Sequence, residues 1–371
     1  MLLLIVLSAW ELSAWVFFKA VGDRFTFFDI NTAVIDAPTV ERLRKSFNPT
    51  LGWKTLYHTP FGERPRRDIH EKNLLATFGD SFTHCDGVSH EETWQTYLAQ
   101  RIGENVLNFG NGAYGTDQAY LRFLEDYPQV RTPLVSLGVM PENINRLVSV
   151  YRKFYYPKTG IPATKPRFLL KDGKLELLKN PIQRAEDLDQ LRLPDQVAAL
   201  GSHDMWFNRN SFPTLGFPYL SIFFHRSFWI EALYGSGRTI NDVDPQPWAN
   251  LWDDLAVRSL MFEIIDRFVH TARSFHAQPF LMIIPAEKHL LQTIKTGEDA
   301  PGVQHLIAHA NQSKYPVFNG VDVLFRAINT GDTIDDLYKV HMTPHGNALL
   351  AEGLYQFLVS NKMVEPNAIR D

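Results

Sequence analysis

The chain has 371 residues and 45% apolar content, so it can bury one large core or two modest ones and is too apolar for disorder. Its formal net charge is -4, from 37 basic and 41 acidic residues. That balance lacks the basic footprint of a nucleic-acid-binding protein, so nucleic acid is not an expected partner. Cys85 is the only cysteine, which excludes an internal disulfide and a thiolate cluster for zinc or iron–sulfur.

Residues 1–19 form an apolar N-terminal segment. The first 18 residues are apolar except for Ser8, Glu11 and Ser13, which is nearly the length of a membrane span. No lysine or arginine precedes this run, unlike in an ordinary signal peptide. We expect membrane association through residues 1–18, which would make the protein membrane-anchored or periplasmic. A buried N-terminal helix is the alternative, and it would leave a cytoplasmic location open.

The region that follows predicts one α/β domain. Residues 20–70 indicate an irregular lead-in that wraps the core, because prolines interrupt it and no period is sustained. Residues 71–371 then alternate short apolar runs with helical patterns, which favours right-handed crossovers and a parallel sheet. We expect a flavodoxin-like three-layer α/β/α sandwich with a central parallel sheet. The expected elements in chain order are strands at 73–80, 105–109 and 133–139 and a helix at 116–124.

A large insertion is expected at about 151–250, where the alternation stops. Its aromatic stretch from Trp206 to Trp229 could stack on sugars, contact lipid or simply form the core of the insertion. The α/β pattern returns with a helix at 255–273 and a strand at 279–284. A last helix is predicted to begin near Pro344.

The segment FGDSFTHCDGV predicts a serine at the end of a buried strand. Ser81 would lie at the carboxyl edge of the sheet, where open α/β folds bind ligands, with the amides of a helix N-terminus beside it. That position suits a nucleophile. The alternative is that Ser81 only caps the helix.

Three further segments follow in a fixed order after GDSFT at 79–83. They are NFGNGAYGTDQ at 108–118, GVMPENINR at 138–146 and VHMTPHGNALLAEGL at 340–354. Together the four segments resemble the conserved blocks of the SGNH (GDSL-like) serine hydrolases. The resemblance implies acyl transfer without a cofactor, on an acylated small molecule or glycan.

The resemblance also implies roles for individual residues. Ser81 would attack the acyl carbonyl, and His341 would take its proton and later return it to the leaving alkoxide. The oxyanion would be held by the Ser81 amide, by an amide of the Gly112–Ala113 turn and by the Asn143 side chain. Asn143 could instead be a helix cap.

Two positions depart from the family pattern. Ala113 stands where relatives usually have glycine. Tyr338 occupies the usual position of the acid, three residues before the histidine. We choose Asp336 as the acid if the loop bulges. Asp335, an acid from elsewhere, and a Ser–His dyad oriented by a backbone carbonyl are the alternatives.

Two competing motifs carry less weight. His341 and His345 have the spacing of metal ligands on a helix, but Pro344 separates them and no acid completes a site, so no metal is expected. His84 is expected to be structural, or at most to line the pocket. The glycines of NFGNGAYG spell the dinucleotide fingerprint, but a GDS strand precedes them and the next strand ends without an acid.

The sequence therefore predicts a serine esterase that removes O-acyl groups, with O-acetyl groups of a cell-surface or exported polysaccharide as the leading substrate. An O-acyltransferase would use the same site, and a long-chain lipase or thioesterase is a further alternative. Tyr338 in the acid's usual position favours a different class, a catalytically degenerate carbohydrate-binding or assembly protein.

Overall fold

The computed structural model describes residues 2–25, 27, 29–55, 59, 62–66, 70–209, 213–235 and 249–366. Its central sheet consists of β3 (Asn73–Gly79), β4 (Asn105–Gly110), β5 (Leu134–Val139), β8 (Gln278–Ile283) and β9 (Val317–Asn319). All neighbouring strands pair in parallel in the order β4-β3-β5-β8-β9. This is the strand order of flavodoxin-like folds, so the predicted fold class is confirmed.

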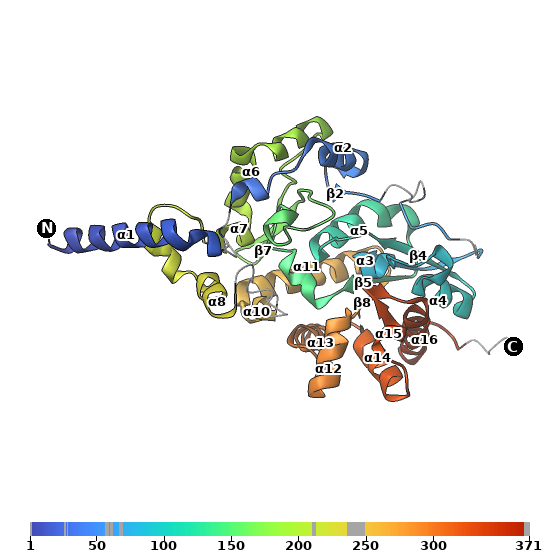
Figure 1. The fold of residues 1–371 in the computed structure, drawn as a ribbon. Helices are drawn as coiled ribbons and strands as arrows, with labels where there is room; N and C mark the ends of the chain where they lie inside the picture. The colour runs from blue at the N-terminus through green and yellow to red at the C-terminus, as the bar shows by residue number, and fades with distance from the viewer. Residues whose placement is uncertain are drawn as a thin grey trace.

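Helices cover both faces of the sheet (Figure 1). They are α4 (Trp94–Ile102), α5 (Thr116–Val130), α11 (Leu255–Ser274), α12 (Glu287–Thr296), α13 (Pro301–Ser313), α14 (Gly320–Asn329) and α16 (Pro344–Ser360). Leu281 belongs to the core under α5, α11 and α13, and the next residue, Met282, belongs to the core under α4, α14 and α16. Successive strand residues face opposite sides, so strands covered on both faces are apolar throughout.

The strands and helices predicted from the sequence occur close to their expected bounds, except that the helix predicted at 116–124 continues to Val130. The sequence analysis did not identify β9, because a strand of three residues leaves no readable pattern. It also left the helices between β8 and α16 unassigned.

The lead-in is more regular than predicted. It contains η1 (Gly22–Arg24), η2 (Ile30–Thr32), α2 (Ala37–Ser46), β1 (Phe47–Asn48) and β2 (Gly52–Trp53). The Asp36 side chain accepts a hydrogen bond from Thr39 N and caps α2, and Pro38 lies in its first turn. Both are favourable signals for a helix start, so the expectation of a wholly irregular lead-in was wrong.

Residues 151–250 add no strand to the central sheet in their described part. Their elements are η5 (Arg152–Phe154), β6 (Arg167–Lys171), β7 (Lys174–Leu178), η6 (Ala185–Arg192), α6 (Pro194–Leu200), η7 (Gly201–His203), α7 (Met205–Arg209), η8 (Tyr219–Phe224), α8 (Arg226–Tyr234) and α10 (Ala249–Asp253). Val197 and Tyr151 share a hydrophobic cluster with Leu43 and Trp53 of the lead-in. These two regions of the chain therefore pack against each other.

The N-terminal helix α1 (Leu2–Val21) projects away from the α/β body (Figure 1). Its stretch Leu4–Val21 is long and apolar enough to cross a membrane, and only 11% of that stretch is buried. The alternative of a buried N-terminal helix is therefore wrong for this chain.

Candidate active site

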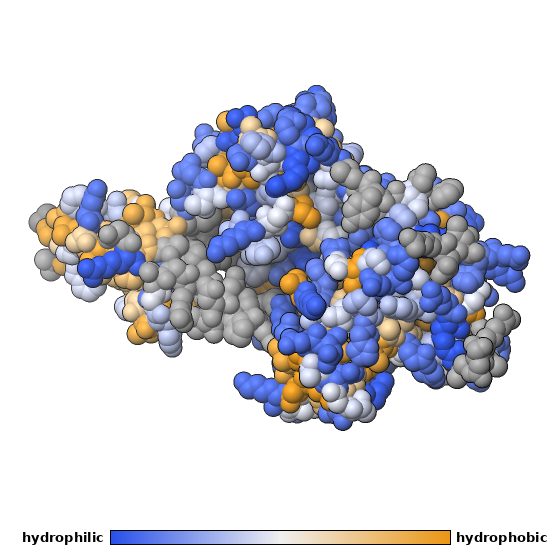
Figure 2. Space-filling view, turned by 45° about the vertical axis from the view of Figure 1, so that its right-hand side comes forward, coloured by the Kyte–Doolittle hydropathy of each residue, from blue (hydrophilic) through white to orange (hydrophobic). Residues whose placement is uncertain are grey.

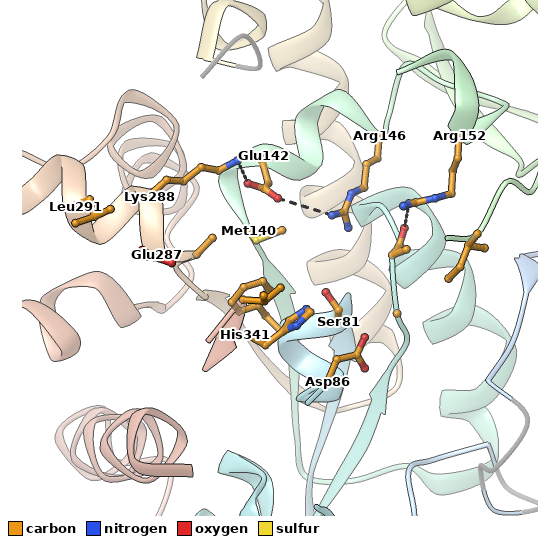
Figure 3. Close-up of a pocket in the computed structure, with 16 residues that line it drawn as sticks. Ser81, Asp86, Met140, Glu142, Arg146, Arg152, Glu287, Lys288, Leu291 and His341 are labelled. Carbon is orange, nitrogen blue, oxygen red and sulfur yellow. Dashed lines mark hydrogen bonds and ion pairs between the residues drawn. The ribbon is translucent and has the colours of Figure 1, made fainter. Parts of the chain in front are cut away.

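A cavity of about 600 Å³ opens beyond the carboxyl ends of the strands. Ser81, the Gly112–Ala113 turn and His341 all line it, although they come from distant parts of the sequence. Figure 3 shows the imidazole of His341 and the hydroxyl of Ser81 facing each other across it. No direct hydrogen bond joins these two side chains among the described contacts, and such contacts are often loose in the absence of substrate.

Ser81 is the first residue of a short helix, α3 (Ser81–His84), that lies directly on the strand ends. A Cβ atom on Gly79 would lie 2.0 Å from Thr83 Oγ1, and one on Gly138 would lie 2.2 Å from the same atom. Only glycine permits this close approach. The glycines at the ends of β3 and β5 therefore let α3 present Ser81 at the sheet edge.

Asp80, and not Ser81, caps α3. Its Oδ1 accepts a hydrogen bond from Phe82 N at 2.9 Å, which leaves the Ser81 hydroxyl without a capping role. Burial raises the pKa of the Asp80 carboxyl, and Arg146, 3.6 Å from Oδ2, opposes that rise. The first amide of a helix has no partner within the helix, so Ser81 N can donate to a ligand.

Asn143 lies in η4 (Pro141–Asn145), immediately after β5. Its Nδ2 donates to Asp80 Oδ2 at 3.0 Å, and its Oδ1 is buried without a partner in the described chain. The residue at the N-cap of η4 is Met140, so Asn143 is not a helix cap. The structure thus ties the third predicted block directly to the residue before Ser81.

The turn Gly112–Ala113 is held by its carbonyl oxygens. Trp53 Nε1 donates to Gly112 O, and an Arg152 amino group donates to Ala113 O, both at 2.9 Å. Ala113 has φ +66°, a left-handed conformation that costs a non-glycine residue about 1 kcal/mol. Ala113 therefore adopts the left-handed conformation that the turn needs, at the cost of some strain. Neither amide of this turn donates to another described residue.

His341 belongs to a small antiparallel hairpin of β10 (Tyr338–Lys339) and β11 (His341–Met342). Val340 connects the two strands with φ +78°, and its exposed fraction is 82%. The ring of Phe82 lies 4.8 Å from the imidazole, measured between centroids. Within the described residues, no hydrogen bond or ion pair involves the side chain of His341.

The structure does not bring Asp336 into contact with His341. Asp336 lies in α15 (Ile334–Leu337), and its carboxylate accepts hydrogen bonds from Thr333 N at 2.8 Å and Thr333 Oγ1 at 2.7 Å. These bonds lower the pKa of the Asp336 carboxyl. Asp335 is exposed in the same turn. The side chain of Tyr338 is buried, and its hydroxyl donates to Pro285 O at 2.8 Å.

The wall of the cavity carries charged residues that sequence analysis did not identify. Glu142 pairs with Lys288 and lies 3.8 Å from Arg146 (Figure 3). Burial alone would raise the pKa of the Glu142 carboxyl, but the neighbouring cations, Lys288 foremost, outweigh it and hold that pKa below its ordinary value. Arg146 lies in the third predicted block, three residues after Asn143, whereas nothing in the sequence marked Lys288.

The lead-in also reaches the site. Arg64 is buried and donates to the carbonyl oxygens of His84 and Cys85, which follow Ser81 in the chain. Together with Trp53 it fixes two of the segments that line the cavity. His84 is buried and contacts Asp86 Oδ1 at 2.5 Å, a structural arrangement as predicted.

The competing motifs lie in other contexts. A Cβ atom on Gly110 would lie 2.2 Å from His84 N, so the first glycine of the dinucleotide-like fingerprint permits the close approach of α3. His345 begins α16 and contacts Asp332 at 3.1 Å, whereas His341 faces the cavity.

Comparison with known proteins gives structural similarity without sequence similarity. No protein-family model and no curated protein matches the sequence. The chain is similar to a member of the lipolytic protein G-D-S-L family from Veillonella parvula (TM-score 0.37, 11% identity, 76% of this chain and 96% of that chain). It is also similar to a catalytic mutant of Axe2, an acetylxylan esterase from Geobacillus stearothermophilus (TM-score 0.40, 11% identity, 78% of this chain and 95% of that chain).

Proposed function

We propose that the protein is a serine esterase that removes O-acyl groups, with O-acetyl groups of a polysaccharide as its substrate. The observation that carries the proposal is the convergence of Ser81, His341 and two sets of unengaged amides on one cavity. A serine at the ends of the strands would not by itself suggest chemistry. A serine at a helix N-terminus with a facing imidazole and oxyanion donors is the arrangement that acyl transfer requires.

In this mechanism Ser81 Oγ attacks the acyl carbonyl carbon while His341 accepts the hydroxyl proton. The carbonyl oxygen becomes an oxyanion that the amides of Ser81 and the Gly112–Ala113 turn stabilise. The C–O bond to the sugar then breaks, and His341 returns the proton to the leaving alkoxide. Water, deprotonated by His341, hydrolyses the acyl-serine to the free acid and regenerates Ser81.

The Asn143 amide is proposed as a further donor to the oxyanion. One of its two N–H groups is already bonded to Asp80, so the second would be the one offered to the substrate. Asp80 therefore serves as a positioning residue, because it caps α3 and orients Asn143 at the same time. Arg146, which lies close to Asp80, is proposed as a further positioning residue.

The direct test is intact-mass spectrometry of the full-length protein after reaction with a fluorophosphonate probe. We expect one adduct on the wild type, none on Ser81→Ala, and a wild-type adduct on Ser202→Ala, which removes an exposed serine far along the chain. Absence of an adduct on folded wild type would reject an activated serine. Hydrolysis of acetyl and octanoyl esters of one chromophore would then define the acyl group, since an acetyl-specific site should reject the longer chain.

A catalytically silent glycan-binding protein is the second candidate, favoured by one observation. His341 has no carboxylate partner in the described chain, and the acid mainly serves to orient the imidazole and stabilise its charged form. Such a protein would retain its affinity for an acetylated glycan in Ser81→Ala and form no acyl-enzyme. Equilibrium binding measured beside the probe experiment separates the two candidates.

A further inference from the structure

The surface of α1 is apolar on nearly all sides. Ala14 and Phe18 are the buried residues of its stretch Leu4–Val21, and they lie four residues apart on one narrow stripe. The remaining large apolar side chains are exposed, among them Leu4, Ile5, Val6, Leu7, Trp10, Leu12, Trp15, Val16 and Phe17. A protein partner would cover one side of such a helix, whereas lipid surrounds it. Twenty residues span about 30 Å, the thickness of a bilayer core.

The buried stripe of α1 packs against residues 213–235, which we call the apolar arm. Phe18 shares a cluster with Ile222 and Phe228 of the arm. The ring of Phe223 lies 5.1 Å from that of Phe18 and 5.8 Å from that of Phe17. Helices α1 and η8 therefore lie side by side along the C-terminal half of α1.

Glu11 joins the arm to the middle of α1. Its carboxylate accepts hydrogen bonds from Tyr219 N and from Leu220 N, the latter at 3.1 Å. A carboxylate within a bilayer is costly unless it has a partner. Two backbone amides at the start of η8 compensate that cost. They also place η8 about 15 Å from the C-terminal end of α1, since each helical residue rises about 1.5 Å.

The outer surface of the arm continues the apolar surface of α1. Its exposed side chains include Leu215, Phe217, Phe224, Trp229, Leu233 and Tyr234. Figure 2 shows this apolar surface gathered at the end of the molecule that carries α1. Arg226 is the basic residue of the arm and Glu231 its acidic residue, and Glu231 is buried.

We propose that the apolar arm is a second membrane-embedded element, which enters the same leaflet as the C-terminal half of α1. The acyl chains of the lipid bilayer would cover its exposed apolar surface. The aromatic side chains of η8 and α8 contact lipid, and the exposed Arg226 extends to the headgroups. The protein would then be held in the membrane by the spanning helix α1 and by the apolar arm beside it. This proposal does not depend on the esterase activity.

The test is nitroxide accessibility of the full-length protein in phospholipid nanodiscs. Cys85, the only native cysteine, is buried, and burial raises the pKa of its thiol to about 12, so it should not take a thiol label. Labels are placed one at a time by Val6→Cys on α1, Phe224→Cys on the arm and Leu193→Cys between η6 and α6, outside the arm. All three side chains are exposed, by 42%, 89% and 54% respectively.

We expect the label at 224 to match the label at 6, with a ratio of oxygen to nickel-chelate accessibility several-fold above that at 193. If the label at 224 behaves like the one at 193 while the label at 6 is in lipid, the apolar arm is not embedded in the membrane. That result would overturn the proposal for the arm and leave α1 as the only membrane-embedded element among the labelled segments. Aqueous labels at both 6 and 224 would overturn the proposal entirely. Neither result bears on the reactivity of Ser81.

Discussion

The two sides of the cavity that Ser81 and His341 line are built differently. The serine side consists of Asp80, Ser81, the Gly112–Ala113 turn and Asn143, and its side chains are fixed by hydrogen bonds and close packing at the ends of three strands. The histidine side is a hairpin of two-residue strands whose imidazole has no hydrogen-bonded partner in the described chain. Pre-organisation is thus concentrated where negative charge would develop on the substrate.

This difference also has a structural origin. The serine side is attached to the sheet, because glycines at the strand ends let α3 rest on them. The histidine side is attached through the buried hydroxyl of Tyr338, which donates to Pro285 O from the position where the acid was expected. The residue at this position therefore anchors the hairpin and does not orient the imidazole.

Asn143→Ala should damage the serine side most. Loss of one oxyanion donor typically lowers the rate about 100-fold to 1000-fold, and the Asp80 carboxylate would also lose one of its partners. The rate of adduct formation with the fluorophosphonate probe measures the effect. Asn145→Ala, in the same 3-10 helix, is the matched control and should react at the wild-type rate. An Asn143→Ala protein that reacts like the control would remove Asn143 from the proposed mechanism.

Acid should destabilise the wall beside the serine side. His289 of α12 is fully buried, its Nδ1 accepts from Ala286 N at 2.9 Å, and burial lowers the pKa of its imidazole to about 4. Below pH 6.5 the unfolded state therefore binds a proton that the folded state does not. The contribution of His289 to the free energy of unfolding is complete above about pH 6.5 and is lost as the pH falls towards 4. The loss is on the order of 3 kcal/mol in total.

Urea unfolding between pH 7 and pH 4.5 measures that loss. His289→Gln should flatten the dependence of the unfolding free energy on pH, because the buried titrating group is gone. His203→Gln, at an exposed position, should leave it unchanged. Equal slopes in the wild type and His289→Gln would show that other groups cause the acid sensitivity.

A carboxylate added beside His341 should raise the rate of acylation. Lys339 pairs directly with His341 across the hairpin, so the two side chains share one face with Cβ atoms about 5 Å apart. Lys339→Asp should stabilise the imidazolium, and about 1.4 kcal/mol of stabilisation corresponds to about a tenfold faster acylation. Lys339→Asp should also shift the pH profile of the acylation rate to higher pH. Lys339→Asn introduces an uncharged side chain of the same size as aspartate, and it should change neither the rate nor the pH profile. Equal rates for the two variants would mean that the imidazole is already oriented.

The sequence was informative where short signals coincide with strong packing. The Gly-Asp-Ser segment predicted the edge serine because a buried strand, a glycine and a helix start follow one another within a few residues. It could not predict the capping role of Asp80, since either residue can cap a helix and the choice depends on how α3 meets the sheet. The third block was found through Asn143, and its bond to Asp80 required the parallel pairing of β3 with β5.

The parts that could not be predicted depend on contacts between distant segments. Nothing local in the lead-in indicates that Trp53 and Arg64 hold the Gly112–Ala113 turn and the loop after Ser81. Asp336 was chosen by its distance in sequence from His341, but Thr333 engages its carboxylate in a local capping arrangement. Local hydrogen bonds of this kind compete with long-range ones and are not visible in spacing alone.

The smallest expected effect concerns the turn that presents His341. Val340 is a β-branched residue with φ +78° and an exposed side chain, a combination that costs stability and gains little from burial. Val340→Asn should raise the free energy of unfolding by about 1 kcal/mol, because asparagine tolerates the left-handed region. Urea denaturation measures this, with Val340→Thr as the β-branched control. A more stable Val340→Asn protein with slower acylation would show that the strain helps to orient the base, whereas an unchanged rate would show that the hairpin tolerates either residue. A destabilised Val340→Asn protein would contradict the strain itself.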